Sequence, residues 1–204
     1  MKQKSGLGLS PTSYVEVYDE PDHLSCCVNE YIYAYRVQLA PGRQTLWHRH
    51  CKDTVYLSLG AAKAGEELVT GAQVATDIPC GVAVSREHFE EPLIHKVTNK
   101  GLDPFFLVGI EAHAVVGRLA DEKALSESHE LLVETKRFKV FSIVVENSTK
   151  IRFPESSLLV SNTESAFDQN GKRITLQRGD VYWFEEALIV SLRGRHRFFL
   201  VVLL

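Results

Sequence analysis

The chain has 204 residues, 45% of them hydrophobic and 24% charged, so it is long enough to bury a core as one domain or two small ones. Its formal net charge of −3 gives no electrostatic reason to expect a nucleic acid or an anionic membrane as a partner. No apolar run approaches the roughly 20 residues that span a bilayer, and the polar start lacks a signal-peptide core, so we expect a cytoplasmic protein.

Residues 1–29 are predicted to form an N-terminal arm with edge strands. The run 31–39 then alternates in a way that predicts a strand with Tyr31, Tyr33 and Tyr35 on one face. Such rings most often pack in a core. In a small barrel, however, inward rings would also line the central cavity, so Tyr33 and Tyr35 are candidate substrate-binding residues.

The strongest chemical signal is the pair His48 and His50, separated by one residue in a strand-like stretch. Side chains on a strand alternate with period two, so both imidazoles should project to the same face, and Trp47 and Arg49 to the other. Asp53 follows closely and adds a hard oxygen ligand. Imidazole with carboxylate suits a divalent Fe, Mn, Ni or Zn ion.

Short strands are predicted over residues 54–59, 73–78, 81–85, 93–98 and 105–113, separated by Gly, Pro, Asn and Asp. This density of short strands indicates an antiparallel all-β protein. His88 falls between two of these strands. It is either a solvated loop histidine or a residue that shields the site and binds substrate, and we include it among the candidate substrate-binding residues.

These motifs resemble those of the cupin superfamily, the RmlC-like jelly rolls. Gly42, His48-x-His50, a nearby acid and Gly60 are similar to the first cupin motif, with Asp53 in place of the family's glutamate. Pro79-Cys80-Gly81 and His95-x-x-x-Asn99 are similar to the second, with a longer insertion of 13 residues between Gly81 and His95. The resemblance implies a double-stranded β-helix whose metal is held by His48, His50 and His95. Asp53 or water would complete the ligand set, or Asp53 would buttress it.

The second half of the chain echoes the first. Leu93-Ile94-His95 corresponds to Leu188-Ile189-Val190, and the segment 151–157 takes the place of the His-x-His element. We therefore expect two tandem cupin units: a metal-binding barrel at 30–116, a linker or short helix at 117–135, and a degenerate barrel without metal ligands at 136–204. The last strand, residues 198–204, lacks polar alternation, so both its faces should be covered.

The resemblance implies a metal-dependent enzyme that acts on a small molecule. Dioxygenase, isomerase, decarboxylase and lyase chemistries all remain open, because the fold does not choose among them. Iron would favour a dioxygenase. The alternative is a non-catalytic cupin module that binds a small ligand. In either case the second half could supply a surface for a homodimer.

Overall fold

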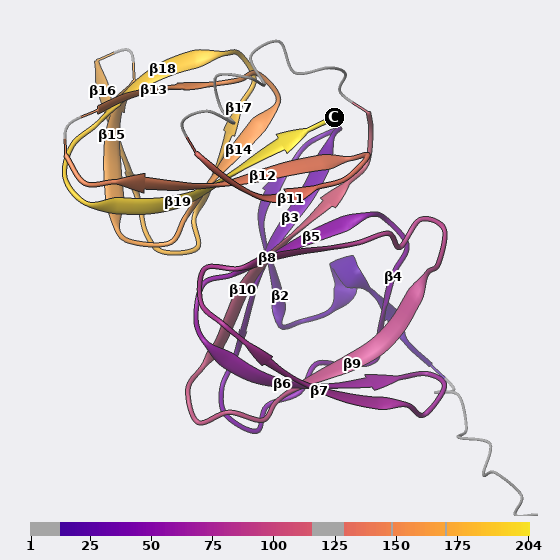
Figure 1. The fold of residues 1–204 in the computed structure, drawn as a ribbon. Coiled ribbons are helices and arrows are strands. Elements are labelled where there is room, and N and C mark those ends of the chain that lie inside the picture. The colour runs from indigo at the N-terminus through magenta and orange to yellow at the C-terminus, as the bar shows by residue number, and fades with distance from the viewer. Residues whose placement is uncertain (1–12, 116–128, 148, 170) are drawn as a thin grey trace, which may run out of the picture.

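The computed structural model describes residues 13–115, 129–147, 149–169 and 171–204, which form two β-barrels in succession (Figure 1). The only helical element in these ranges is one turn of 3-10 helix, η1 (Val17–Asp19), and no helix there is long and apolar enough to cross a membrane. The predicted all-β jelly-roll architecture is therefore confirmed.

The first barrel consists of two five-stranded sheets. One sheet carries the His-x-His element and has the order β1 (Val15–Glu16), β4 (His48–His50), β9 (Leu93–Asn99), β6 (Ala62–Leu68) and β7 (Gln73–Ile78). The other has the order β2 (His23–Val28), β3 (Ile32–Leu39), β10 (Phe105–Ala112), β5 (Thr54–Ser58) and β8 (Ala83–Arg86).

The second barrel repeats this plan. Its five-stranded sheet has the order β11 (Glu130–Glu134), β12 (Phe138–Val145), β19 (His196–Leu203), β14 (Ser157–Ser161) and β17 (Val181–Phe184). Its four-stranded sheet has the order β13 (Thr149–Phe153), β18 (Leu188–Leu192), β15 (Ser165–Gln169) and β16 (Lys172–Leu176).

Equivalent turns in the two barrels carry the same hydrogen bonds. Gly81 has φ 84° and donates its N–H to the carbonyl of Ser58 at 2.9 Å, while Gly179 has φ 89° and donates to Ser161 at 2.8 Å. Both glycines lie in the left-handed region that disfavours a Cβ atom. The internal repeat that the sequence predicted is thus present in the backbone.

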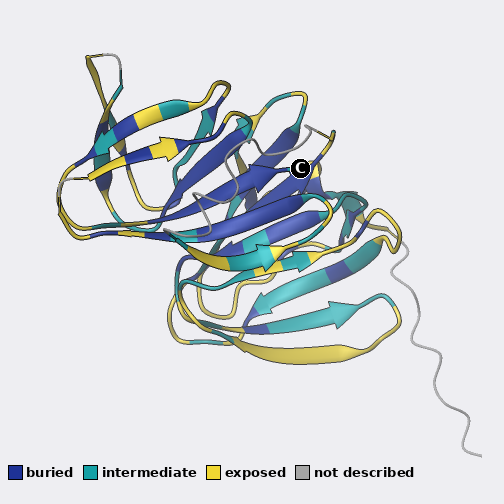
Figure 2. Ribbon diagram, turned by 45° about the horizontal axis from the view of Figure 1, so that its top comes forward, coloured by how far each residue is buried: buried dark blue, intermediate teal, exposed yellow. Residues whose placement is uncertain are grey.

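The sheet of the first barrel that contains β3, β10 and β5 shares one hydrophobic core with the five-stranded sheet of the second barrel. Ile32, Val55 and Ile110 of the first barrel lie in the same buried cluster as Val140 and Leu203 of the second. Figure 2 shows the buried strands concentrated where the barrels meet. The second barrel therefore covers an apolar face of the first.

Strand β19 confirms the expectation for the end of the chain, because all its residues from Phe198 to Leu203 are buried. One prediction needs correction. Residues 130–134 form strand β11, paired with β12, and are not part of a linker or helix; the rest of that predicted segment, up to residue 128, lies outside the described residues. Strand β6 was not predicted, because its Lys, Gly and Glu residues hide the strand pattern.

Candidate metal centre

Three buried histidines from two adjacent strands converge inside the first barrel. His48 and His50 lie on β4 and are each 1% exposed, and His95 lies on β9 directly opposite His48. Each residue offers one ligand nitrogen, and these nitrogens all lie within 4.8 Å of one another. His48 and His50 therefore project to one face, as strand alternation predicted. The pairing of β4 with β9 places His95 beside them.

A hydrogen-bond acceptor holds the Nδ1 atom of each histidine. His48 donates to the carbonyl of Leu46 at 2.9 Å, His50 to a carboxylate oxygen of Glu111 at 3.2 Å, and His95 to Glu66 at 2.6 Å. Such contacts fix the tautomer and the orientation of a ligating imidazole. The Nε2 atom of each ring is consequently the one left to bind a ligand.

The donor set fits a divalent transition metal. The Nε2 atom of His95 is buried and has no hydrogen-bond partner among the described residues, a costly state for a nitrogen that a metal ion would relieve. Burial lowers the pKa of His48 to about 2 and holds that of His50 well below its usual value. Both rings are therefore neutral near pH 7, the form that binds metal.

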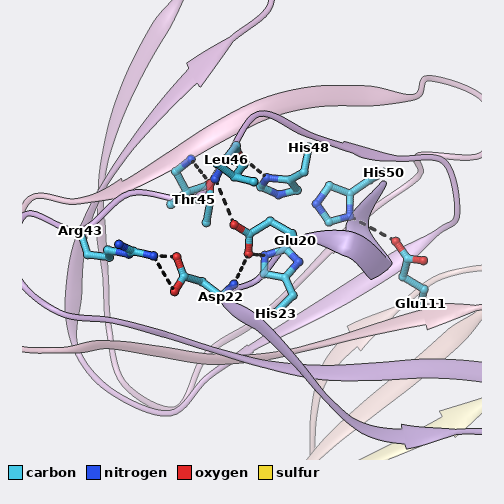
Figure 3. Close-up of polar contacts among 10 residues, drawn as sticks. Glu20, Asp22, His23, Arg43, Thr45, Leu46, His48, His50 and Glu111 are labelled. Atoms are coloured by element: carbon cyan, nitrogen blue, oxygen red, sulfur yellow. Dashed lines mark hydrogen bonds and ion pairs between the residues drawn. The ribbon is translucent and has the colours of Figure 1, made fainter. Parts of the chain in front are cut away.

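The turn before β4 is held by a buried carboxylate (Figure 3). Glu20, 2% exposed, accepts the N–H of Leu46 at 3.0 Å and that of Asp22 at 2.7 Å. Asp22 in turn forms an ion pair with Arg43 at 3.1 Å. Because the Leu46 carbonyl orients His48, these contacts pre-position the first ligand.

Asp53 does not join the histidines, and the expectation that it completes or buttresses the metal shell is corrected. Its Oδ1 accepts the N–H of Phe89 at 3.0 Å, and its Oδ2 lies 3.7 Å from the Nε of Arg137 in the second barrel. Thr54, the next residue, is the one paired with Glu111 across β5 and β10. The carboxylate that reaches His50 therefore comes from β10.

A cavity of about 200 Å³ opens beside the three histidines. Apolar side chains of β3, β9 and β10 line much of it, including Val37, Val97, Phe105 and Leu107. Arg86 also lines the cavity and is exposed to solvent, so it lies at the entrance. The space is below the roughly 300–1,000 Å³ of drug-sized ligand pockets, which indicates a small ligand.

The three candidate substrate-binding residues differ in position. Tyr35 is fully buried and lines the cavity. Tyr33 is buried against Tyr35, with ring centroids 5.4 Å apart, but is not among the lining residues. His88 is buried rather than solvated: its Nε2 lies 3.1 Å from the hydroxyl of Tyr56, and its ring stacks on His50 at 5.2 Å.

Sequence reasoning missed four residues of this centre. His23 lines the cavity and contacts His48 edge-on at 4.7 Å, while Glu66, Glu111 and Tyr56 contact the ligands or His88. None of them belongs to a short motif. All four share an inward position on a strand, and that position cannot be recognised until the pairing of the strands is known.

The second barrel holds apolar residues at the equivalent positions. Ile151 lies opposite Val190 as His48 lies opposite His95, and Phe153 takes the place of His50. Ile151, Phe153 and Val190 are all at most 7% exposed and belong to one hydrophobic cluster. The metal ligands are replaced by core packing, as the sequence comparison of the two halves predicted.

No family model and no curated protein matches the sequence. Among solved structures, salicylate 1,2-dioxygenase from Pseudaminobacter salicylatoxidans is similar at 11% identity over 88% of this chain and 75% of its own, with a TM-score of 0.59. AerE from Microcystis aeruginosa is similar at 9% identity over 91% of this chain and 98% of its own, also at 0.59. A cupin domain from Bordetella pertussis Tohama I is 28% identical over 45% of this chain and 92% of its own, with a TM-score of 0.41. The chain has the cupin fold, built as two tandem jelly-roll barrels.

Proposed function

We propose that the protein is a metal-dependent cupin enzyme, a dioxygenase that uses an iron ion held by His48, His50 and His95. The observation that carries the proposal is the convergence of three buried imidazoles, each with its Nδ1 already hydrogen-bonded and its Nε2 left to bind a ligand. The likeness to a dioxygenase in overall fold supports it further.

Three neutral ligands leave the full charge of a divalent ion in place and leave coordination positions open toward the cavity. Iron(II) bound there would supply dioxygen activation, whereas Zn, Mn or Ni would supply Lewis-acid polarisation of a substrate oxygen. Glu66 and Glu111 keep the rings in the ligating tautomer and make them more basic through their hydrogen bonds.

The cavity supports a small organic acid as substrate. The guanidinium of Arg86 at the entrance can bind a carboxylate, since its N–H groups match the geometry of two oxygens. The apolar walls would hold the body of the molecule and exclude water. Structures of the similar salicylate 1,2-dioxygenase include adducts with gentisate, which is an acid of this size class.

The alternative is a non-catalytic module that binds a small ligand. One feature of the second barrel favours this alternative. The fold persists there with Ile151, Phe153 and Val190 in place of the ligands. The first barrel, however, retains three ligands together with their hydrogen-bond acceptors. In a binding module the metal would hold the ligand without activating dioxygen.

The test is oxygen consumption. Protein reconstituted anaerobically with iron(II) should consume dioxygen when salicylate or gentisate is added, and the same protein loaded with zinc should not. Arg86→Gln should raise KM more than it lowers kcat, because it removes only a carboxylate contact. Iron-loaded protein that binds these acids without consuming dioxygen would support the binding module instead.

A further inference from the structure

The loop that joins β8 to β9, residues 87–92, lies at the rim of the cavity. Arg86 and Leu93, the residues directly before and after this loop, both line the cavity. His88 is the one buried side chain of the loop, at 4% exposed, whereas the other five residues are exposed. In the second barrel the equivalent connection, residues 185–187, is half as long and has no buried residue. Of the two barrels, only the first therefore has a loop here that buries a side chain.

His88 packs against two residues of the metal centre. Its ring stacks on that of His50, with centroids 5.2 Å apart and planes 29° apart, and its Nε2 lies 3.1 Å from the hydroxyl of Tyr56. Tyr56 lines the cavity, but His88 does not. The loop therefore covers the metal centre without filling the space that a ligand would occupy.

Asp53 holds the backbone of the 87–92 loop from outside. Its Oδ1 accepts the N–H of Phe89, the residue after His88, at 3.0 Å. The ring of Phe89 is 63% exposed and has the Nζ of Lys52 6.0 Å from its centroid. A loop with one buried side chain and exposed neighbours has a low free energy of local opening. The hydrogen bond to Asp53 should therefore set how often the loop opens.

The second barrel contacts the same carboxylate. Oδ2 of Asp53 lies 3.7 Å from the Nε of Arg137, in the turn between β11 and β12. Thr135 holds this turn, because its Oγ1 accepts the N–H groups of Arg137 and Phe138 at 3.1 and 2.9 Å. An ion pair that is partly exposed contributes little on its own. Its effect is to orient the carboxylate, so that the other oxygen faces the loop.

We propose that the 87–92 loop is a gate that limits access to the metal centre, and that Asp53 is the positioning residue that keeps this gate closed. The inference rests on the proposed function only for a metal ion at His48, His50 and His95, and not on turnover. Asp53 does not contact these histidines. More frequent opening should therefore speed entry and release equally and leave the equilibrium affinity unchanged.

The test measures the rate of zinc release from zinc-loaded protein into excess chelator, together with the equilibrium affinity for zinc. Asp53→Ala should speed release about tenfold, the effect of losing one hydrogen bond to a charged group, at unchanged affinity. Asp53→Asn keeps an acceptor oxygen for Phe89 and should restore most of the slow release. Arg137→Gln should speed release about twofold. Asp77→Ala is the matched control, since Asp77 pairs with Lys63 at 3.6 Å on another part of the barrel and should change neither quantity.

A second measurement follows the loop itself by amide hydrogen exchange. The N–H of Phe89 should exchange about tenfold faster in Asp53→Ala than in wild type. This exchange should not respond to low concentrations of urea, because a local opening exposes little surface. Exchange that rises with urea as steeply as that of the β10 amides would mean global unfolding, and would overturn the proposal.

Zinc release from Asp53→Ala at the wild-type rate, or faster release with an equal loss of affinity, would also overturn the proposal. Wild-type protein that binds no zinc would overturn it together with the metal centre. Slow zinc release by wild type and fast release by Asp53→Ala, without oxygen consumption by the iron-loaded protein, would count against the dioxygenase assignment alone.

Discussion

His95 in the first barrel and Val190 in the second occupy the same place in two copies of one strand arrangement. His95 lies directly opposite His48 across β4 and β9, and Val190 lies directly opposite Ile151 across β13 and β18. The chain thus carries its own apolar counterpart of the metal centre. A residue taken from the second barrel shows what the fold accepts at a given position in the first.

Glu66→Gln should weaken metal binding roughly tenfold to 100-fold, because the loss of a carboxylate partner lowers the basicity and the order of a ligating histidine. The neutral amide would replace the contact of 2.6 Å with His95. Competition with a fluorescent chelator measures the affinity. Glu67→Gln is the matched control, since Glu67 instead forms an ion pair with Lys96 at 2.9 Å and should leave the affinity unchanged.

Asp53→Asn should leave metal affinity unchanged, since its carboxylate contacts Phe89 and Arg137 rather than the histidines. It should lower the free energy of unfolding by about 1 kcal/mol, through a weakened hydrogen bond to the 87–92 loop. Metal titration and urea unfolding of the same preparation measure the two effects. A clear loss of metal would restore Asp53 as a ligand.

Metal-free protein should lose stability as the pH falls below about 6.5. Burial lowers the pKa of His48 to about 2, of His23 to about 3 and of His88 to about 4, and that of His50 also falls well below its usual value. Above the unfolded pKa both states are neutral; below it only the unfolded chain binds protons, so each histidine costs up to about 1.4 kcal/mol per pH unit.

Glu111 acts in the opposite direction, because burial raises its pKa to about 7 and the folded state then binds a proton that the unfolded chain does not. One carboxyl group against four histidines leaves a net loss of stability. Urea midpoints of chelator-treated protein at pH 7.5, 6.5 and 5.5 measure it. Midpoints that stay constant or rise toward pH 5.5 would show that these histidines accept protons in the folded state.

A fragment of residues 1–115 should aggregate, although it keeps every proposed metal ligand. Ile32, Val55 and Ile110, each 0% exposed in the whole chain, would lose the second barrel that covers them. Exposed apolar surface of this kind promotes association. Size-exclusion chromatography beside the full chain measures the outcome, and a monomeric, metal-loaded fragment would show that the two barrels are independent.

The sequence was sufficient to predict an all-β protein and the shared face of His48 and His50, because both depend on local patterns. Alternation over residues 31–39 predicted a strand, and the spacing of His48 and His50 predicted a shared face. The placement of His95 depended on the family resemblance. Val190 was matched to His95 because a Leu-Ile pair precedes both residues.

The partners of the ligands could not be predicted, because they depend on register between strands far apart in the sequence. Glu111 lies 61 positions from His50, and Glu66 lies on a strand whose charged residues concealed it. The prediction for Asp53 failed for the opposite reason. It is close to the histidines in sequence, but it precedes strand β5 and turns toward the 87–92 loop and the second barrel.

The central claim, that the first barrel holds one metal ion and the second holds none, is tested most directly by the metal content of His95→Val. This change places in the first barrel the residue that the second barrel carries at the same position, and valine suits a buried strand. Elemental analysis should find one metal ion per chain in wild type and almost none in a folded His95→Val protein. Full metal occupancy in that variant, or two ions per wild-type chain, would contradict the account.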